Sequence, residues 1–239
     1  MQDGVFTDTR TTVSYDPDSL RLFARVLNGI GFAIGFWVLA WPQPYKLAVL
    51  GAMTAFVAAL AVKLLSRQRL GITDARGGNS RPGVQALFLM PALVVPLRAL
   101  QDINLLEWQP VLLWSLALAA GLAIPLFAGD KELPKKPLFA AFLLILTYAY
   151  AWGSLAEANS MFDTSAPQIF QTTIRSMHAN YGKSTSYHLR LGPWNGRPAG
   201  DDVRVPRALY VRHRAGETMC VALRNGWLGF RYEEARSCW

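Results

Sequence analysis

Long apolar segments alternate with short polar ones over the first two thirds of the chain. A helix that crosses a bilayer needs about 20 mostly apolar residues, and five segments approach or reach that length. We expect helices at about residues 20–41, 45–65, 84–100, 108–128 and 138–156. The third is the weakest, because Pro91 and Pro96 interrupt a short apolar core. A segment that enters the membrane and returns is the alternative to a kinked span.

The pattern changes after residue 157. Residues 184–191 alternate polar and apolar side chains, which is typical of a half-buried strand. Asn225-Gly226 is a strong signal for a two-residue hairpin turn. Other strand-like stretches lie at 168–179, 202–205, 218–223 and 227–232, with a single helical turn at 207–213. We therefore predict a membrane α-helical bundle over residues 1–157 and, over 158–239, a small β-sheet or open-barrel domain outside the membrane.

The composition agrees with a membrane bundle. The chain is 52% hydrophobic and 17% charged, whereas soluble domains average about 25% charged residues. Its net charge of +8 raises the question of nucleic acid binding. Lys and Arg beside apolar spans have a simpler role, because they set the orientation of a membrane protein. We therefore expect a lipid bilayer as partner and no nucleic acid.

The basic residues lie almost entirely on one side of the expected bundle. With five spans, the N-terminus and the connections 66–83 and 129–137 share a side with eleven Lys and Arg, against two on the other. This asymmetry predicts a cytoplasmic N-terminus and a C-terminal domain across the membrane. If the third segment does not span, the C-terminal domain becomes cytoplasmic. The eleven are Arg10, Arg21, Arg25, Lys63, Arg67, Arg69, Arg76, Arg81, Lys131, Lys135 and Lys136; the two are Lys46 and Arg98.

Small residues at four-residue spacing occur in two of the expected helices. They are Gly31 and Gly35 in the first and Ala117 and Gly121 in the fourth. Such spacing lets two helix backbones approach closely. We expect these residues to pack within one bundle, and a contact between two copies of the chain is the alternative.

Both cysteines lie in the C-terminal domain. Cys220 is on one arm of the expected hairpin and Cys238 lies just beyond the other. In an oxidising compartment such a pair forms a disulfide, which would tether the C-terminal tail. Free buried thiols and a redox or metal role are the alternatives.

No residues were assigned to catalysis, a metal or a cofactor. His178, His188 and His213 fall on separate expected elements without a short ligand spacing, so we interpret them as surface residues. Ser184 or Ser186 could be combined with His188 and Asp201, but no nucleophile-elbow motif is present.

Four arginines crowd a short stretch of the C-terminal domain. A solvated face is the simple interpretation, and contact with anionic lipid headgroups or an acidic partner is the sharper one. The four are Arg204, Arg207, Arg212 and Arg214.

The last 60 residues or so contain a recurring pattern of tyrosine, glycine, acid and apolar positions. Its residues are Tyr210, Gly216, Glu217, Cys220, Val221, Leu223, Gly226, Leu228 and Gly229. In this pattern the chain resembles uncharacterised bacterial inner-membrane proteins that have a few helices before a small β domain. Glu217 stands where Asp is commoner. The resemblance implies a bacterial inner-membrane setting, and it implies no activity. In that setting, the orientation predicted from the basic residues puts the C-terminal domain in the periplasm.

These observations favour a non-enzymatic scaffold or accessory subunit whose outer domain contacts a partner, the envelope or lipid. A small transporter or channel component is the alternative, and polar lining inside the bundle would favour it. An enzyme would need clustered polar groups that face one cleft. We expect a membrane or envelope protein, or a second copy of the chain, as a further partner.

Overall fold

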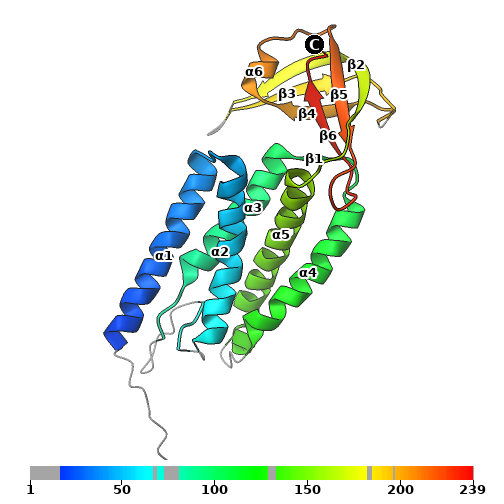
Figure 1. The fold of residues 1–239 in the computed structure, drawn as a ribbon. Coiled ribbons are helices and arrows are strands. Elements are labelled where there is room, and N and C mark those ends of the chain that lie inside the picture. Colours follow the sequence, from blue (N-terminus) through cyan, green and yellow to red (C-terminus); the bar gives the residue numbers. More distant parts are fainter. Residues whose placement is uncertain are drawn as a thin grey trace, which may run out of the picture.

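Five long helices run side by side, and a β domain lies at one end of them (Figure 1). The computed structural model describes residues 17–66, 69–72, 81–128, 133–181, 185–195 and 197–238. The predictions for Arg10, Arg67, Arg76, Lys131 and Ser184 fall outside these residues. The helices are α1 (Pro17–Ala40), α2 (Tyr45–Leu65), α3 (Gln85–Asp102), α4 (Gln109–Phe127) and α5 (Pro137–Met161), with a 3-10 turn, η1 (Leu133–Lys135), before α5.

The helices alternate in direction along the chain. In Figure 1, α1 begins at the end far from the β domain, and α5 ends beneath that domain. The last turns of α2 and α4 and the first turns of α3 and α5 consequently lie at the far end, on the same side as the start of α1. A helical bundle followed by a C-terminal antiparallel sheet was expected and is confirmed.

Four of the five helices, α1, α2, α4 and α5, are long and apolar enough to cross a membrane. Helix α3 does not reach that hydropathy, since it carries Gln85, Arg98 and Asp102 among 18 residues. It lies inside the bundle, however, where α1, α2 and α5 pack against it. A helix that other helices enclose does not need an apolar surface on every side, which explains why the third segment gave the weakest pattern.

Glycines bring α1 and α5 close to the central helix α3. A Cβ atom added at Gly31 would overlap the backbone of Ala86 and Leu87, and one at Gly35 would overlap Met90. Gly153 of α5 approaches α3 in the same way, although the sequence pattern did not single it out. The other predicted pair behaves differently. Ala117 and Gly121 are exposed on the outside of α4, and a Cβ atom at Gly121 would meet nothing within 4 Å.

Two polar side chains satisfy helix ends inside the bundle. Asn28 of α1 donates a hydrogen bond to the Gly83 carbonyl (2.8 Å) and accepts one from the Ala86 amide (2.8 Å), so it caps the start of α3 from a neighbouring helix. Lys63 of α2 is buried and donates to the Leu126 carbonyl at the end of α4. A cation at a helix C-terminus is favourable because the last carbonyls carry partial negative charge.

The β domain is a six-stranded antiparallel sheet that curls toward a barrel, in the order β1-β6-β5-β2-β3-β4. Strand β2 shows why it curls. Its first half pairs with β5 and its second half with β3, and the pairing with β3 shifts between Ile174 and Ser176. Such an irregularity bends a strand and increases its twist. The strands are β1 (Asn104–Leu105), β2 (Gln168–Asn180), β3 (Ser186–Leu191), β4 (Asp201–Val205), β5 (Thr218–Arg224) and β6 (Tyr232–Arg236), with the one-turn helix α6 (Arg207–Tyr210) after β4.

The prediction of a two-residue hairpin turn at Asn225-Gly226 is wrong. β6 begins only at Tyr232, and residues 225–231 form a longer loop that reaches down to α5. Leu228 in this loop is 37% exposed, whereas Phe230 is buried beside Trp152 of the bundle. Docking of the loop on the helices therefore outweighs the local turn preference.

Cys220 and Cys238 form a disulfide with a Cα–Cα distance of 5.0 Å. Cys220 is in the middle of β5, and Cys238 follows β6. The bond therefore ties the end of the described chain to the neighbouring strand.

We predict that Gly31→Ala lowers the melting temperature of the detergent-solubilised protein, because α1 and α3 must separate to admit the methyl group. Overpacking of this kind costs about 1–3 kcal/mol. Gly29→Ala is the matched control in the same helix, since a Cβ atom there meets nothing within 4 Å. It should leave stability unchanged or raise it slightly, because Ala favours helix more than Gly. Equal melting temperatures for the two variants would contradict the close α1–α3 contact.

Candidate functional site: the pocket between bundle and β domain

Asn159, near the end of α5, fixes the β domain to the bundle. Its side chain donates to the Phe230 carbonyl (2.7 Å) and accepts from the amides of Leu228 (2.9 Å) and Phe230 (3.3 Å). Its own carbonyl accepts a hydrogen bond from the Trp227 amide (2.9 Å). Because Asn159 is fully buried, these contacts set the position of the loop 225–231 and hence of β5 and β6.

A second attachment comes from the connection between α3 and α4. Residues 104–105 of this connection form β1, which pairs with β6 through Asn104↔Glu233 and Leu105↔Tyr232. The Leu106 amide donates to the Arg231 carbonyl (2.9 Å). Two points of attachment, at α5 and at β1, hold one side of the β domain against the helices.

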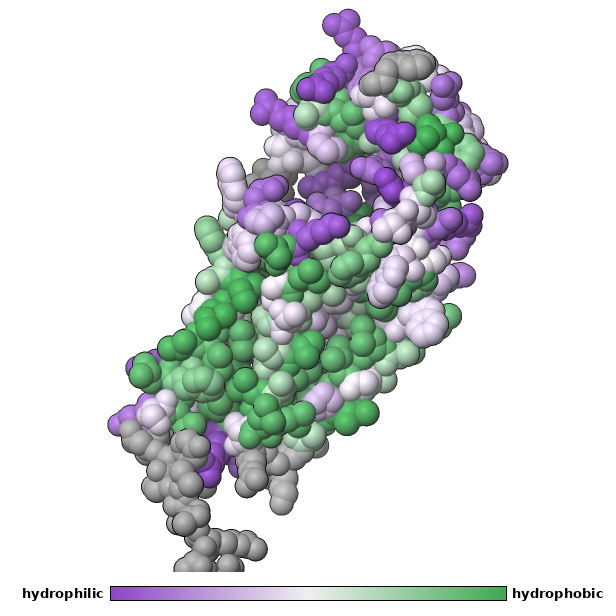
Figure 2. Space-filling view, in the orientation of Figure 1, coloured by the Kyte–Doolittle hydropathy of each residue, from purple (hydrophilic) through white to green (hydrophobic). Residues whose placement is uncertain are grey.

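A polar cavity of about 540 Å³ lies between the two parts, and we call it the junction pocket. Its walls come from β4, α6 and β6 of the β domain and from the adjacent ends of α2, α3 and α5. Figure 2 shows a hollow with a hydrophilic lining between the β domain and the apolar helices. Its volume falls in the range of about 300–1,000 Å³ that is typical of small-molecule sites.

The floor of the junction pocket is a linked set of polar side chains. The Tyr45 hydroxyl lies 2.9 Å from Asp102 Oδ2 and 2.9 Å from both carboxylate oxygens of Glu157. Asp102 also pairs with Arg98 at 2.8 Å. Glu157 is fully buried beneath the pocket. Three helices thus contribute to one network, which gives the floor a fixed arrangement of acceptors.

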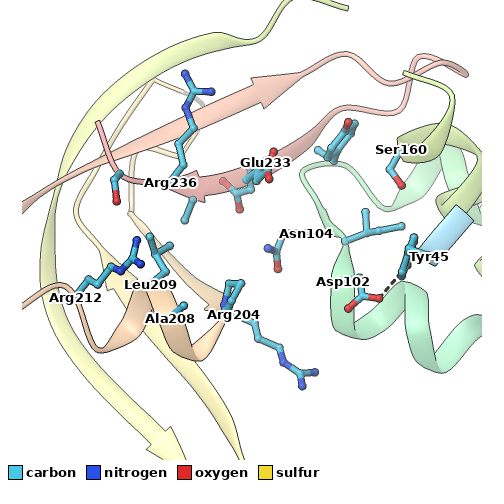
Figure 3. Close-up of a pocket in the computed structure, with 16 residues that line it drawn as sticks. Tyr45, Asp102, Asn104, Ser160, Arg204, Ala208, Leu209, Arg212, Glu233 and Arg236 are labelled. Atoms are coloured by element: carbon cyan, nitrogen blue, oxygen red, sulfur yellow. Dashed lines mark hydrogen bonds between the residues drawn. The ribbon is translucent and has the colours of Figure 1, made fainter. Parts of the chain in front are cut away.

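The opposite wall, from the β domain, is rich in arginine. Arg204, Arg212 and Arg236 line the pocket, and none of them has an ion-pair partner among the residues that the structure describes. In Figure 3, Arg212 and Arg236 lie on one side of the cavity, while Tyr45 and Asp102 lie on the other. Arginine without a partner is well suited to bind phosphate or carboxylate groups, to which it donates in bidentate geometry.

Glu233 of β6 lines the same pocket and is buried. Burial raises the pKa of Glu233 to about 8, and the neighbouring Asp201 carboxylate adds to the rise, while Arg197 opposes it. Oε2 of Glu233 has no hydrogen-bond partner among the described residues. At neutral pH the side chain is mostly protonated, and its charged neighbours are Asp201 and Arg197.

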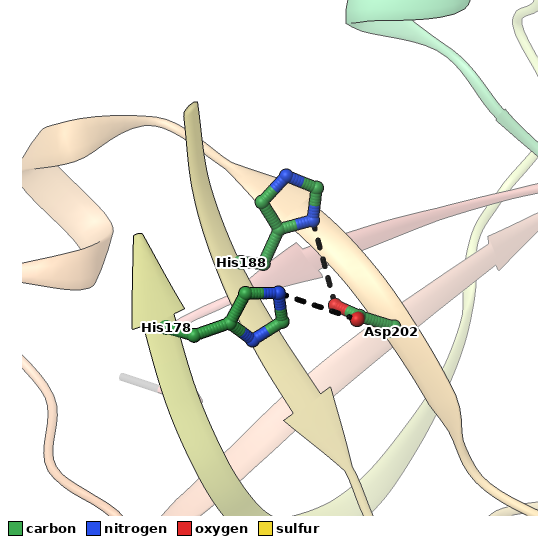
Figure 4. A group of neighbouring side chains, drawn as sticks. All are labelled: His178, His188 and Asp202. Carbon is green, nitrogen blue, oxygen red and sulfur yellow. Dashed lines mark ion pairs between the residues drawn. The ribbon is translucent and has the colours of Figure 1, made fainter. Parts of the chain in front are cut away.

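The histidines divide into a pair and a single residue. His178 and His188 stack at a ring-centroid distance of 5.0 Å, and both lie near Asp202 (Figure 4). His213 lies elsewhere, 3.1 Å from Glu217 and 3.0 Å from Ser237. The sequence analysis placed His178 and His188 on separate elements correctly, but it did not anticipate that strand pairing brings the two rings together.

The predicted basic stretch contributes only in part to the pocket. Arg204 and Arg212 line it, whereas Arg207 and Arg214 do not. Arg236, Glu233 and Asp102 were not recognised in the sequence analysis. Asp102 was recognisable as an acid at the end of an apolar segment, but nothing in the sequence indicates that β6 would lie above it.

Comparisons with protein-family models, curated proteins and solved structures find no match to this chain. Function is therefore inferred from the chain's own chemistry.

We predict that the protein loses stability as the pH rises from about 4.5 to about 8. The pKa of Glu233 is raised in the folded state, so the folded protein holds a proton that the unfolded chain releases in this window. Glu233→Gln keeps an uncharged side chain of the same shape. Melting temperatures between pH 5 and pH 8.5 should therefore fall less steeply for this variant than for the wild type. Glu234→Gln, on the neighbouring exposed position, is the control, and an equal effect of both changes would contradict the assignment.

Proposed function

We propose that this chain is a multi-pass protein of a bacterial inner membrane, with a non-enzymatic scaffold or accessory role, that binds a phospholipid headgroup in the junction pocket. The observation that carries the proposal is the position of three arginines, which have no ion-pair partner within the described part of the chain, at the end of an apolar helical bundle. If the helices cross the bilayer, this level corresponds to the headgroup region, where phosphate groups are abundant.

The charges around the pocket support a zwitterionic headgroup in particular. Arg212 and Arg236 are suited to a phosphate, and the carboxylate of Asp102 across the cavity is suited to an ammonium group. Phosphoethanolamine combines both charges in one headgroup, and the apolar side chains of Ile103 and Leu209 leave room for the adjoining glycerol.

The interior of the bundle supports a scaffold more than a transporter. Phe56, Phe88 and Tyr150 stack in its centre, with Phe56–Tyr150 ring centroids 3.8 Å apart and Phe56–Phe88 centroids 4.6 Å apart. Buried Leu60 and Leu143 belong to the same cluster. At this level the described side chains form an apolar centre, which disfavours a path for an ion or polar solute, so the transporter hypothesis remains the second candidate.

For the orientation we predict a periplasmic C-terminus. Alkaline phosphatase fused after the last residue should be active, and green fluorescent protein at the same position should be dark, because the basic connections favour the cytoplasmic side. The Cys220–Cys238 disulfide gives an independent readout, since it forms in the periplasm and not in the cytosol. A bright fluorescent fusion together with free thiols would overturn the proposed orientation.

For the headgroup we predict that protein extracted in mild detergent retains phosphatidylethanolamine, seen as a mass increment in native mass spectrometry. Arg212→Gln and Arg236→Gln should each lower the retained fraction several-fold, since a charge-assisted phosphate contact contributes about 1.5–3 kcal/mol. Arg214→Gln is the matched control, two residues from Arg212 but outside the pocket.

Soluble glycerophosphoethanolamine and inorganic phosphate distinguish the source of the phosphate. A lipid site should retain the lipid in the presence of either competitor at millimolar concentration. Displacement by inorganic phosphate alone would indicate a general anion site. Equal lipid retention in the Arg212, Arg236 and Arg214 variants would show that the junction pocket does not hold the headgroup.

A further inference from the structure

The polar face of strands β2, β3 and β4 brings three potential metal ligands together. His178 of β2 is directly opposite His188 of β3, and Asp202 of β4 lies two residues from Arg204, the residue opposite His188. Side chains at opposed positions of antiparallel strands project from the same face of the sheet. The sheet register therefore places two imidazoles and one carboxylate side by side, as Figure 4 shows.

The distances from the two imidazoles to the carboxylate of Asp202 are close to those between the ligands of a zinc site. His178 Nε2 lies 3.5 Å from Asp202 Oδ2, and His188 Nδ1 lies 3.4 Å from Asp202 Oδ1. Ligands about 2.0–2.1 Å from a tetrahedral zinc ion are about 3.4 Å from one another. All three ligand atoms lie within 4.8 Å of one another. The His178 side chain is 43% exposed, so its ring has room to make the small approach that closes the triangle.

Ser186 orients the second imidazole. The Nε2 atom of His188 lies 3.2 Å from the Ser186 hydroxyl. If Nδ1 binds a metal ion, the proton must be on Nε2, from which it is donated to Ser186 Oγ. A hydrogen bond from the non-ligating nitrogen is the usual way in which a protein fixes the tautomer and orientation of a ligand histidine. The serine is thus a positioning residue for His188.

The donor set selects the kind of metal ion. Two imidazole nitrogens and one carboxylate suit Zn²⁺ and neighbouring transition metals, whereas Mg²⁺ and Ca²⁺ prefer oxygen ligands. Arg190 and Arg204, the register partners of Asp202 and His188, lie on the same face and add positive charge. A site with two neutral nitrogen donors tolerates that charge better than a site that depends on carboxylates alone.

We propose that His178, His188 and Asp202 form a transition-metal site, selective for Zn²⁺ over Mg²⁺, with a fourth position open to water. The inference is independent of the junction pocket, because neither histidine lines that cavity. Three protein ligands with one open position are the arrangement found where a zinc ion binds an exogenous ligand. On a surface of this domain, such a site would let a zinc-binding side chain of another envelope protein complete the coordination.

The test uses the full chain in detergent, purified through a tag without histidine and freed of metal with a chelator. Isothermal titration with ZnCl₂ should give one site per chain that an excess of MgCl₂ does not block. His178→Ala, His188→Ala and Asp202→Asn should each weaken binding by more than about 100-fold, because each removes a ligand. Ser186→Ala should weaken it less, by about 10–100-fold, the range known for partners of ligand histidines.

His213→Ala is the matched control, because it removes the remaining histidine, which lies outside the cluster. It should leave the affinity and the stoichiometry unchanged. Cobalt(II) provides a second readout, since a tetrahedral site gives intense visible absorption that the ligand variants should lose. Absence of saturable Zn²⁺ binding, or equal binding in the His188 and His213 variants, would overturn the site. Melting curves without metal establish that each variant is folded.

Discussion

The hydrogen bonds of Asn159 hold the two parts of the molecule in one relative position. This amide is buried, and it satisfies two backbone amides and one carbonyl of the loop 225–231. Without it those backbone groups would be buried and unpaired, at about 1–3 kcal/mol for each. β5 and β6 continue directly from the loop, so their place above the helices follows from this contact. The junction pocket exists because these contacts hold the β domain above the ends of α2, α3 and α5.

Much of the fold follows from periodicity in the sequence. The helices begin and end within a few residues of the expected positions, and β2, β3, β4, α6 and β5 coincide with the strand-like and helical stretches. The errors arise where tertiary contacts outweigh local preference. Asn225-Gly226 has the composition of a tight hairpin. The contacts that Trp227, Leu228 and Phe230 make with α5 stabilise the longer loop more than a tight turn would. The two residues of β1 carry no strand pattern of their own and become a strand only by pairing with β6.

The candidate sites were harder to predict, because their members are far apart in the sequence. Tyr45, Asp102 and Arg236 meet in one cavity only after the bundle and the sheet have formed. Clustering in the sequence revealed Arg204 and Arg212, but it also included Arg207 and Arg214, which do not line the cavity. His178 and His188 are ten residues apart, and only the register of β2 and β3 shows that they face each other. In a sheet, a shift of one residue would place one imidazole on the opposite face.

β1 lies in the connection between α3 and α4, so the sheet of the β domain includes a strand from the helical part of the chain. β6 would be an outer strand with free backbone groups, and such edges invite pairing with other chains. Here the connection between α3 and α4 covers it. A fragment that begins after α5 would lack this cover and expose both the edge of β6 and the apolar underside of its preceding loop. The C-terminal portion therefore has the outline of a separate module but depends on the connection between the helices to cover its edge strand.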